Sequence, residues 1–382
     1  MFFIVFFLLY GGMHVYAFLR VRAAIPMGTA YQTVLFLAMA ALTLMPFFVR
    51  LAEKHGYETF ARWLSFGGYI WMGVLFLFCS WSLVLDLYRF VIRAGEMFLH
   101  RDLAVFRPSP HLRFLIPCVL SLVSAAYGYY EALSIRTEKI TLQTTKLPDS
   151  AERLRIVQIS DVHLGLIVRG GRLGRILQVV SRAQPDILVS TGDLVDGQIN
   201  GLPGLAEMLQ AINPRFGKYA IPGNHEYYAG FRQAEDFAVR SGFTMLRGKS
   251  ISIDGLITIA GTDDPAGAYF HKEDGISEKE LLSGTSRKQF TLLLKHRPFI
   301  NKECLGLFDL QLSGHVHKGQ IFPFGLLTKL YYPVHAGFSG FGQNSHLYVS
   351  RGTGTWGPPI RFLSPPEVTV IDLVRHPRSI ME

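Results

Sequence analysis

The chain has 382 residues, of which 49% are hydrophobic and 18% charged, and its mean hydropathy is +0.25. This hydropathy is well above that of an ordinary soluble domain, and it excludes a disordered chain and a simple soluble enzyme. The net charge is +9, but neither half of the chain is basic enough to indicate nucleic-acid binding. Of the three cysteines only Cys304 lies in the polar half, so no disulfide can form there and cysteine usage leaves the compartment open.

Four apolar runs occupy the first third of the chain, at residues 2–19, 33–49, 63–85 and 114–130. Each is close to the roughly 20 residues that a helix needs to cross a bilayer. No basic residue precedes Phe2, so the first run does not resemble a cleaved signal peptide. We therefore expect residues 1–132 to form an N-terminal bundle of four transmembrane α-helices in a multi-pass protein of a plasma or inner membrane.

The short loops between the runs predict the orientation, because Arg and Lys are retained on the cytoplasmic side during insertion. The first and third loops hold seven basic residues: Arg20, Arg22, Arg89, Arg93, Arg101, Arg107 and Arg113. The second loop holds three: Arg50, Lys54 and Arg62. This imbalance predicts that residues 140–382 lie outside the cytoplasm. Three basic residues after the last run favour the opposite orientation: Arg136, Lys139 and Lys146.

From about Ile140 short β-branched runs alternate with amphipathic stretches, the pattern of an α/β domain. We expect a linker and first strand over residues 133–150 and the folded domain over 151–382. The predicted strands are 154–159, 186–190, 218–221, 290–295 and 310–313, with a helix at 171–183. The strand at 154–159 is expected to complete its sheet without any upstream residue, so a chain beginning near Ile140 should fold.

Each predicted strand ends in side chains that can bind a metal. Alone, such an Asp can cap a helix and such a His can be an ordinary core or surface residue. Together the strand ends supply three Asp, one Asn and five His: Asp161, His163, Asp193, Asp196, Asn224, His225, His296, His315 and His317. Oxygen and imidazole donors without thiolates suit Mn, Fe or Zn, and the number of donors exceeds the needs of one tetrahedral ion. A hydrolytic centre with two divalent metals fits this set best.

These residues form blocks that resemble a known family. Asp-x-His stands at 161–163, Gly-Asp-x-x-Asp at 192–196, Gly-Asn-His-Glu at 223–226, a His at 296 and Gly-His-x-His at 314–317. Their order resembles the calcineurin-like metallophosphoesterases over roughly residues 150–375, and most closely a membrane-associated branch similar to the bacterial YkuE and YaeI proteins. The resemblance implies an αββα sandwich with metals at the carboxyl ends of the strands. The four-helix half is outside this pattern.

The resemblance also implies roles for single residues. Asp161, His163 and His317 would hold one metal, and Asn224, His296 and His315 the other. Asp193 would bridge the two. His225 would donate a proton to the leaving oxygen, and Glu226 would keep its imidazole charged and oriented. Asp196 either supports the site or only hydrogen-bonds the backbone of its loop, and the sequence leaves both possibilities open.

Several other polar residues have ordinary explanations and are not assigned to the catalytic set. The segment 263–265, Asp-Asp-Pro, is typical of a turn, although it can also line a substrate mouth. Four other polar residues are also left out of the catalytic set, because single basic or histidine side chains are commonly found at a solvated surface: Arg351, Lys318, His335 and His346.

The expected function is hydrolysis of a phosphoester or pyrophosphate by attack of a metal-bound hydroxide, carried out by an enzyme anchored in the bilayer. The substrate is a phosphorylated small molecule or lipid, and the anchor favours a lipid-linked phosphate. An alternative is a degenerate phosphatase domain used as a membrane scaffold or sensor, which the intact ligand set opposes. A transporter with a regulatory head is a further alternative, but charge within the spans is limited to Asp86 near one end.

Overall fold

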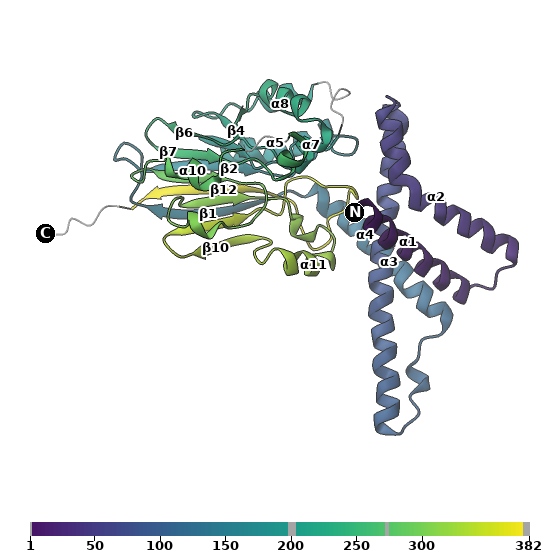
Figure 1. Ribbon diagram of the computed structural model, residues 1–382. Coiled ribbons are helices and arrows are strands. Elements are labelled where there is room, and N and C mark those ends of the chain that lie inside the picture. Colours follow the sequence, from purple (N-terminus) through teal and green to yellow (C-terminus); the bar gives the residue numbers. More distant parts are fainter. Residues whose placement is uncertain (1, 198–203, 272–274, 377–382) are drawn as a thin grey trace. The chain divides into compact units, whose positions relative to one another are not determined.

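The computed structural model describes residues 2–197, 204–271 and 275–376. The chain forms two compact units (Figure 1). The first comprises the chain up to Tyr130 together with Gly357–Phe362, and the second comprises Glu131–Trp356 and the chain from Leu363 onward.

Four long helices make up most of the first unit: α1 (Phe2–Ala24), α2 (Thr29–Lys54), α3 (Glu58–Leu99) and α4 (Pro110–Leu133), with a short helix η1 (Ala104–Phe106) before α4. All four are long and apolar enough to cross a membrane, which confirms the four predicted runs. The helix α3 has 42 residues and is therefore about 63 Å long, so the predicted run at 63–85 is only its central part. The segment Gly357–Phe362 packs with this unit, where the amide of Arg361 donates to the carbonyl of Gly128 at 2.9 Å.

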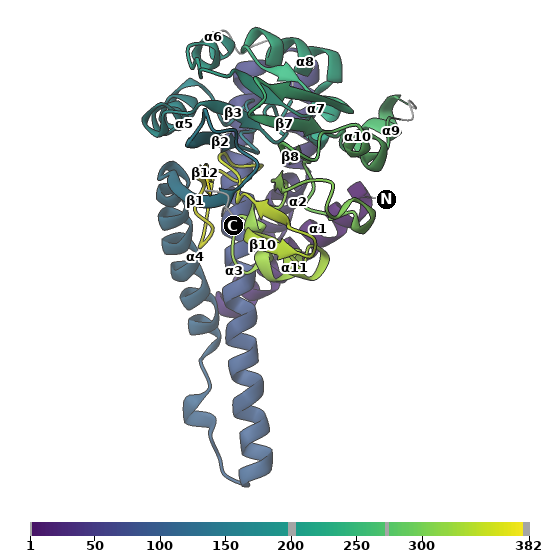
Figure 2. The same ribbon diagram turned by 90° about the vertical axis from the view of Figure 1, so that its left-hand side faces the viewer.

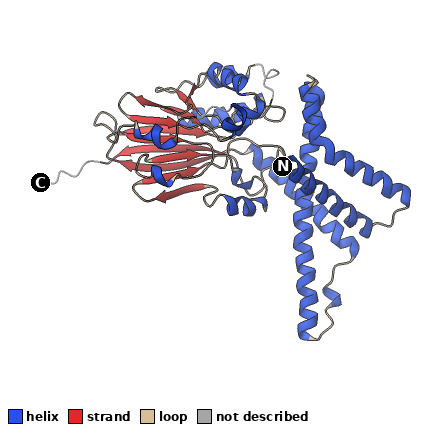
Figure 3. Cartoon of the chain, viewed as in Figure 1, coloured by secondary structure: helices blue, strands red, loops and turns tan. Residues whose placement is uncertain are grey.

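Two six-stranded sheets form the second unit (Figure 3). The first sheet has the order β1 (Arg136–Thr144), β12 (Glu367–Arg375), β2 (Arg153–Ile159), β3 (Ile187–Ser190), β4 (Lys218–Ala220) and β5 (Thr244–Met245). The second has the order β10 (Gly337–Phe341), β11 (Ser345–Val349), β9 (Leu310–Ser313), β8 (Phe290–Leu294), β7 (Ile257–Gly261) and β6 (Lys249–Ile253). The five predicted strands are therefore present as β2, β3, β4, β8 and β9.

Apolar side chains hold the layers together. Residues such as Ile156, Val189 and Leu312 fill the space between the two sheets. The helices α5 (Gly170–Ala183), α6 (Leu205–Gln210) and α8 (Phe231–Arg240) cover the outer face of the first sheet (Figure 2). On the second sheet α10 (Glu278–Ser283) and η2 (Lys302–Cys304) pack around Leu282 and Leu293. The unit is thus the expected αββα sandwich.

The strand directions place the predicted site at one end of the sandwich. The strands β2, β3 and β4 are parallel neighbours, as are β7, β8 and β9. Because parallel strands end at the same sheet edge, the loops that follow them lie together. The short helices that follow these strands are α7 (Asn224–Ala229) after β4, α9 (Ala266–His271) after β7 and η3 (His317–Gly319) after β9; α9 packs against α7, and α11 (Phe324–Tyr331) packs against η3.

The strand β1 corrects one expectation. It pairs in parallel with β12 along its whole length, from Arg136 opposite Glu367 to Thr144 opposite Arg375. The first sheet is therefore not complete from residue 154, and a chain beginning at Ile140 would lack the first four residues of β1. A shortened chain that preserves this sheet must begin before Arg136.

An ion pair across β2 and β12 supports a first prediction. Arg155 donates to both carboxylate oxygens of Asp372, at 2.8 and 3.0 Å, and these bonds lower the pKa of Asp372. Asp372→Asn is expected to reduce the free energy of unfolding by about 1–2 kcal/mol at neutral pH. Because the folded-state pKa is depressed, this stabilisation is present above the unfolded pKa and is lost as the pH falls through the folded value. Urea unfolding of both proteins from neutral to acidic pH tests this.

The exposed Asp236 on α8 provides the matched control. Asp236→Asn should leave the unfolding curve unchanged. A stability difference for Asp372→Asn that persists unchanged in acid would contradict the ion-pair explanation.

Candidate metal centre

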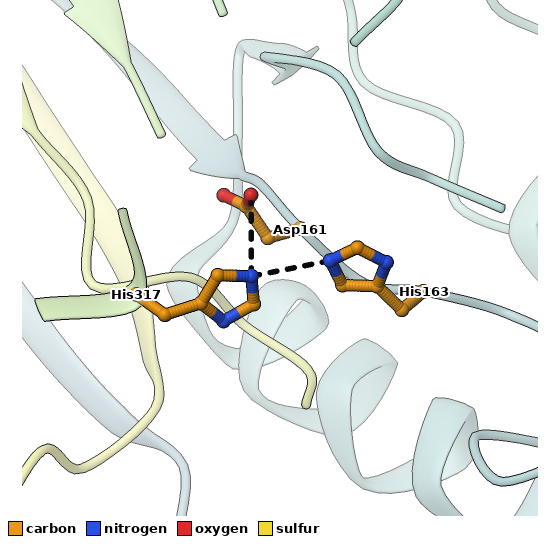
Figure 4. A group of neighbouring side chains, drawn as sticks. All are labelled: Asp161, His163 and His317. Carbon is orange, nitrogen blue, oxygen red and sulfur yellow. Dashed lines mark hydrogen bonds and ion pairs between the residues drawn. The ribbon is translucent and has the colours of Figure 1, made fainter. Parts of the chain in front are cut away.

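The first ligand group combines residues from two strand ends. Asp161 and His163 follow β2, and His317 follows β9 (Figure 4). The Nε2 atoms of His163 and His317 lie 3.1 Å apart, and His317 Nε2 lies 3.5 Å from Asp161 Oδ1. Nitrogen ligands about 2.1 Å from one ion lie roughly 3 Å from each other, so this spacing suits a shared metal.

The second ligand group lies around β8 and contains Asp193, His296 and His315. His296 Nε2 lies 3.2 Å from Asp193 Oδ2 and 3.1 Å from His315 Nδ1. His296 Nδ1 is 2.8 Å from the carbonyl oxygen of Thr191. A proton donated from Nδ1 to this carbonyl leaves the lone pair of Nε2 directed at the other two ligands.

Asp193 connects the two groups. Its Oδ2 atom is 3.2 Å from His296 Nε2 and 3.9 Å from His163 Nε2, while its Oδ1 accepts the amide proton of His225 at 2.8 Å. Burial would raise the pKa of Asp193, but His296 and His225 hold it well below the ordinary value. The carboxylate is therefore ionised and lies within reach of both ligand groups.

The electrostatics of the buried carboxylates favour bound cations. Burial alone would lower the pKa of His296, yet Asp193 and Asp161 raise it to about 10. The pKa of His315 is lowered to about 3 by burial and by the neighbouring His296. Two carboxylates that draw a proton onto one imidazole of a close pair would equally attract a divalent ion.

Asn224 adds a further donor at the start of α7. Its Oδ1 atom is buried and has no hydrogen-bond partner among the described residues. A buried acceptor without a partner costs free energy, which a metal ligand would not. The two carboxylates, four imidazoles and one amide therefore fit two divalent ions of the Mn, Fe or Zn type.

His225 contacts a different carboxylate from the expected one. Its Nδ1 atom lies 2.7 Å from Asp196 Oδ1. Burial would lower the pKa of His225, but Asp193 and Asp196 raise it to about 9, so the ring is protonated at neutral pH. Asp196, which the sequence left open, is thus a carboxylate in direct contact with the imidazole, and together with Asp193 it keeps the ring charged.

Glu226 has another role. Its carboxylate accepts four backbone protons, from Gly223 at 2.7 Å and from the consecutive residues Asp193, Leu194 and Val195 at 2.9, 2.7 and 3.2 Å. Both oxygens of Glu226 accept protons from the loop backbone, so Glu226 does not orient the His225 ring through these bonds, whereas its charge does help to raise the pKa of His225 as expected. Glu226 ties the loop after β3 to the loop after β4, and so fixes Asp193 relative to Asn224.

Gly223 lies so close to Asp193 that there is no room for a side chain, and this supports a second prediction. A Cβ atom on Gly223 would lie 2.2 Å from Asp193 Oδ1 and 2.7 Å from its backbone nitrogen. Gly223→Ala should therefore displace Asp193 and reduce metal affinity at least about tenfold with every ligand present. Metal content after equilibrium dialysis measures the loss. Gly171→Ala, where a Cβ meets nothing within 4 Å, should retain both metals; equal retention in the two variants would refute the steric explanation.

An ion pair next to the centre escaped the sequence interpretation. Arg297 donates to both oxygens of the buried Asp264, at 2.7 and 3.0 Å, and directly follows His296. The segment 263–265 therefore has a structural role beyond a turn. In the sequence, the only sign of this ion pair is that Arg297 directly follows the predicted ligand His296.

Aromatic rings surround the histidines. Tyr228 and Trp356 lie 5.3 and 5.7 Å from His225, and Tyr332 lies 5.7 Å from His315, measured between ring centroids. By contrast, Arg351 pairs with Glu138 and with the buried Glu367, so its charge is compensated within the fold. His346 stacks on Phe338, away from the two ligand groups.

Comparison with known proteins gives consistent matches. The profile of the family described as calcineurin-like phosphoesterase matches residues 154–319. An uncharacterized metallophosphoesterase of Aquifex aeolicus is 40% identical over 255 residues, which cover 66% of this chain and 97% of that protein. The uncharacterized metallophosphoesterase YkuE of Bacillus subtilis is 32% identical over 65% of this chain and 89% of its own. A transmembrane protein with metallophosphoesterase domain from Bos taurus is 29% identical over 90% of this chain and 80% of its own.

Proposed function

We propose that the protein is a membrane-anchored hydrolase that cleaves a phosphoester or pyrophosphate bond with the help of two divalent metals. The chain belongs to the calcineurin-like phosphoesterase family, and this membership supports the proposal. The observation that carries this proposal is the pair of ligand groups joined through Asp193, with the protonated His225 beside them. A scaffold or sensor with a degenerate site would have no need of this complete set.

The residues of the chain have distinct tasks in such a reaction. Two divalent ions, when bound, supply Lewis acidity toward phosphate oxygens and lower the pKa of a water. His225 is placed to give its proton to the departing oxygen, and Asp196 keeps the imidazole charged until then. The rings of Tyr228 and Trp356 contact His225 and limit the access of bulk water to it.

The membrane anchor supports a substrate class. Phosphate groups on lipids are concentrated at the surface where the anchor holds the enzyme, whereas a soluble metabolite gains nothing from it. We therefore propose a lipid-linked phosphate or pyrophosphate as the substrate, with the metals binding the phosphate and neighbouring loops binding the rest.

The proposal is tested on the purified full-length protein. Its metal content is measured first, and hydrolysis of phosphomonoesters, phosphodiesters and pyrophosphates then follows, with and without detergent-solubilised lipids. We expect two divalent ions per chain and turnover that chelation abolishes and metal restores. Two bound metals without turnover of any ester would favour the scaffold alternative.

We also propose that the phosphoesterase unit lies outside the cytoplasm, on the basis of the uneven basic loops. A membrane-impermeant maleimide should label His55→Cys, between α2 and α3, in intact cells. Labelling of Arg101→Cys, between α3 and α4, should require permeabilisation. The reverse pattern would place the enzyme in the cytoplasm and favour cytoplasmic lipid precursors as substrates.

A further inference from the structure

The surface of α11 is unusually apolar for a folded domain. The exposed fractions are 59% for both Leu326 and Leu327, 84% for Leu330 and 67% for Tyr331. None of the residues of α11 is buried. Phe299, Phe322 and Phe324 add exposed aromatic rings, and Phe299 lies 5.7 Å from Tyr331 between centroids. We call these seven residues the α11 patch; exposed apolar patches of this kind mark interaction surfaces.

The α11 patch adjoins the metal centre. Tyr332 directly follows α11, and its ring lies 4.8 Å from Tyr331 and 4.9 Å from Phe299. The Tyr332 ring also lies 5.7 Å from that of the ligand His315, measured between centroids. At its beginning α11 packs against η3, which starts at the ligand His317. Whatever binds the patch is therefore brought next to the metals.

The chain segment that contains α11 has charge of one sign. No Asp or Glu occurs between Leu310 and Pro366. Lys318 and Lys329 lie near His335. Burial lowers the pKa of His335 most, and the charges of the two lysines lower it further. An apolar helix with nearby lysines and no acidic residue complements an anionic lipid surface.

The connection to α4 selects the bilayer among possible occupants. α4 ends at Leu133 and β1 begins at Arg136, so two residues join the phosphoesterase unit to a membrane helix. The unit is thereby always held at a bilayer, at an effective concentration that a second protein would not reach. A partner protein or a second copy would not require that acidic residues be missing from the segment that contains α11.

We propose that the α11 patch inserts into the lipid interface and places the metal centre against lipid headgroups. An interfacial helix of this type enters the headgroup region by about 5–10 Å. The insertion itself does not depend on catalysis. Its consequence, that the substrate phosphate belongs to a lipid in the bilayer, rests on the proposed hydrolase function.

The first experiment measures insertion alone. A polarity-sensitive fluorophore is attached to Leu330→Cys in the full-length protein, reconstituted in phosphatidylcholine vesicles with and without phosphatidylglycerol. Val239→Cys, at an exposed position on α8, is the matched control. The native chain provides the labelling background, because two of its cysteines are buried and Cys118 is half-buried. We expect a blue shift and quenching by spin-labelled lipid at residue 330 only, both stronger with phosphatidylglycerol.

Equal quenching at residues 330 and 239, or none at 330, would overturn the proposal. A blue shift at 330 that follows protein concentration and is not quenched by lipid would also overturn it, in favour of a second copy of the chain.

The second experiment measures the consequence. Leu327→Ser/Leu330→Ser is compared with Val239→Ser/Ile276→Ser, in which two exposed apolar residues are likewise changed. On phosphatidic acid in vesicles the α11 variant should lose about tenfold or more in kcat/KM, while its hydrolysis of bis(p-nitrophenyl) phosphate stays within about twofold. The control should be unchanged on both. Equal losses on both substrates would show a structural effect and contradict a role in lipid access. Inactivity of the native protein on every ester, with quenching intact, would refute the hydrolase function and leave the insertion standing.

Discussion

Replacing Asp193 by asparagine is expected to lower turnover at least about a thousandfold and to reduce the content of both metals. The reason is that one carboxylate serves two groups of ligands, with Oδ2 lying 3.2 Å from His296 Nε2 and 3.9 Å from His163 Nε2. The side-chain amide of asparagine is neutral and has a single oxygen, so it cannot replace a carboxylate shared by two cations. Metal content per chain and kcat on a soluble diester, measured on the same preparation, check the result.

Asp236→Asn controls for the loss of one negative charge, since Asp236 is exposed on α8. It should keep both metals and full activity. Full metal content and turnover in the Asp193 variant would refute the assignment of this residue as the bridge. A loss of folded structure, detected by circular dichroism, is not expected because asparagine has nearly the same shape.

The second large effect concerns proton donation by His225. His225→Ala should retain the metals but slow the hydrolysis of esters with poor leaving groups by about 100-fold to 10,000-fold, and of esters with good leaving groups far less. Poor leaving groups need a proton from the enzyme, whereas good ones depart as anions. Rates on a series of aryl and alkyl esters provide the measurement, and equal slowing across the series would exclude a role as the acid.

Asp196→Asn tests how the proton is held. Asp196 raises the pKa of His225, which reaches about 9 with the help of Asp193. Since the protonated ring is the active form, activity falls as the pH rises through this pKa. Removing the Asp196 charge lowers the pKa, so the alkaline limb of the pH–rate profile should move to lower pH. Glu226→Gln should move that limb less than Asp196→Asn does, because Glu226 raises the pKa of His225 only through its charge, and it should lower metal affinity, because its carboxylate binds the loop amides. The opposite pattern would restore Glu226 as the partner of His225.

The sequence by itself predicted the four long apolar helices, five strands and the residues that the fold gathers into the candidate metal centre. Apolar runs of membrane-spanning length leave little alternative to helices. The ligands were predictable because each follows a short buried strand, as Asp161 follows β2 and Asp193 follows β3. Parallel strands bring their carboxyl ends to one edge, so residues more than 150 positions apart, such as Asp161 and His317, meet there.

Other features were decided only by the tertiary structure. Asp196 and Glu226 are both acidic residues within the motif blocks at 192–196 and 223–226, and no local pattern states which carboxylate meets His225. The answer depends on how two loops approach each other, because the reach of Glu226 to the amides of Asp193, Leu194 and Val195 leaves Asp196 beside the imidazole. The pairing of β1 with β12 joins strands more than 200 residues apart, and the exposure of α11 depends on what the rest of the fold leaves uncovered. Spacing in a sequence records neighbours along the chain, whereas these contacts are set by where distant segments pack.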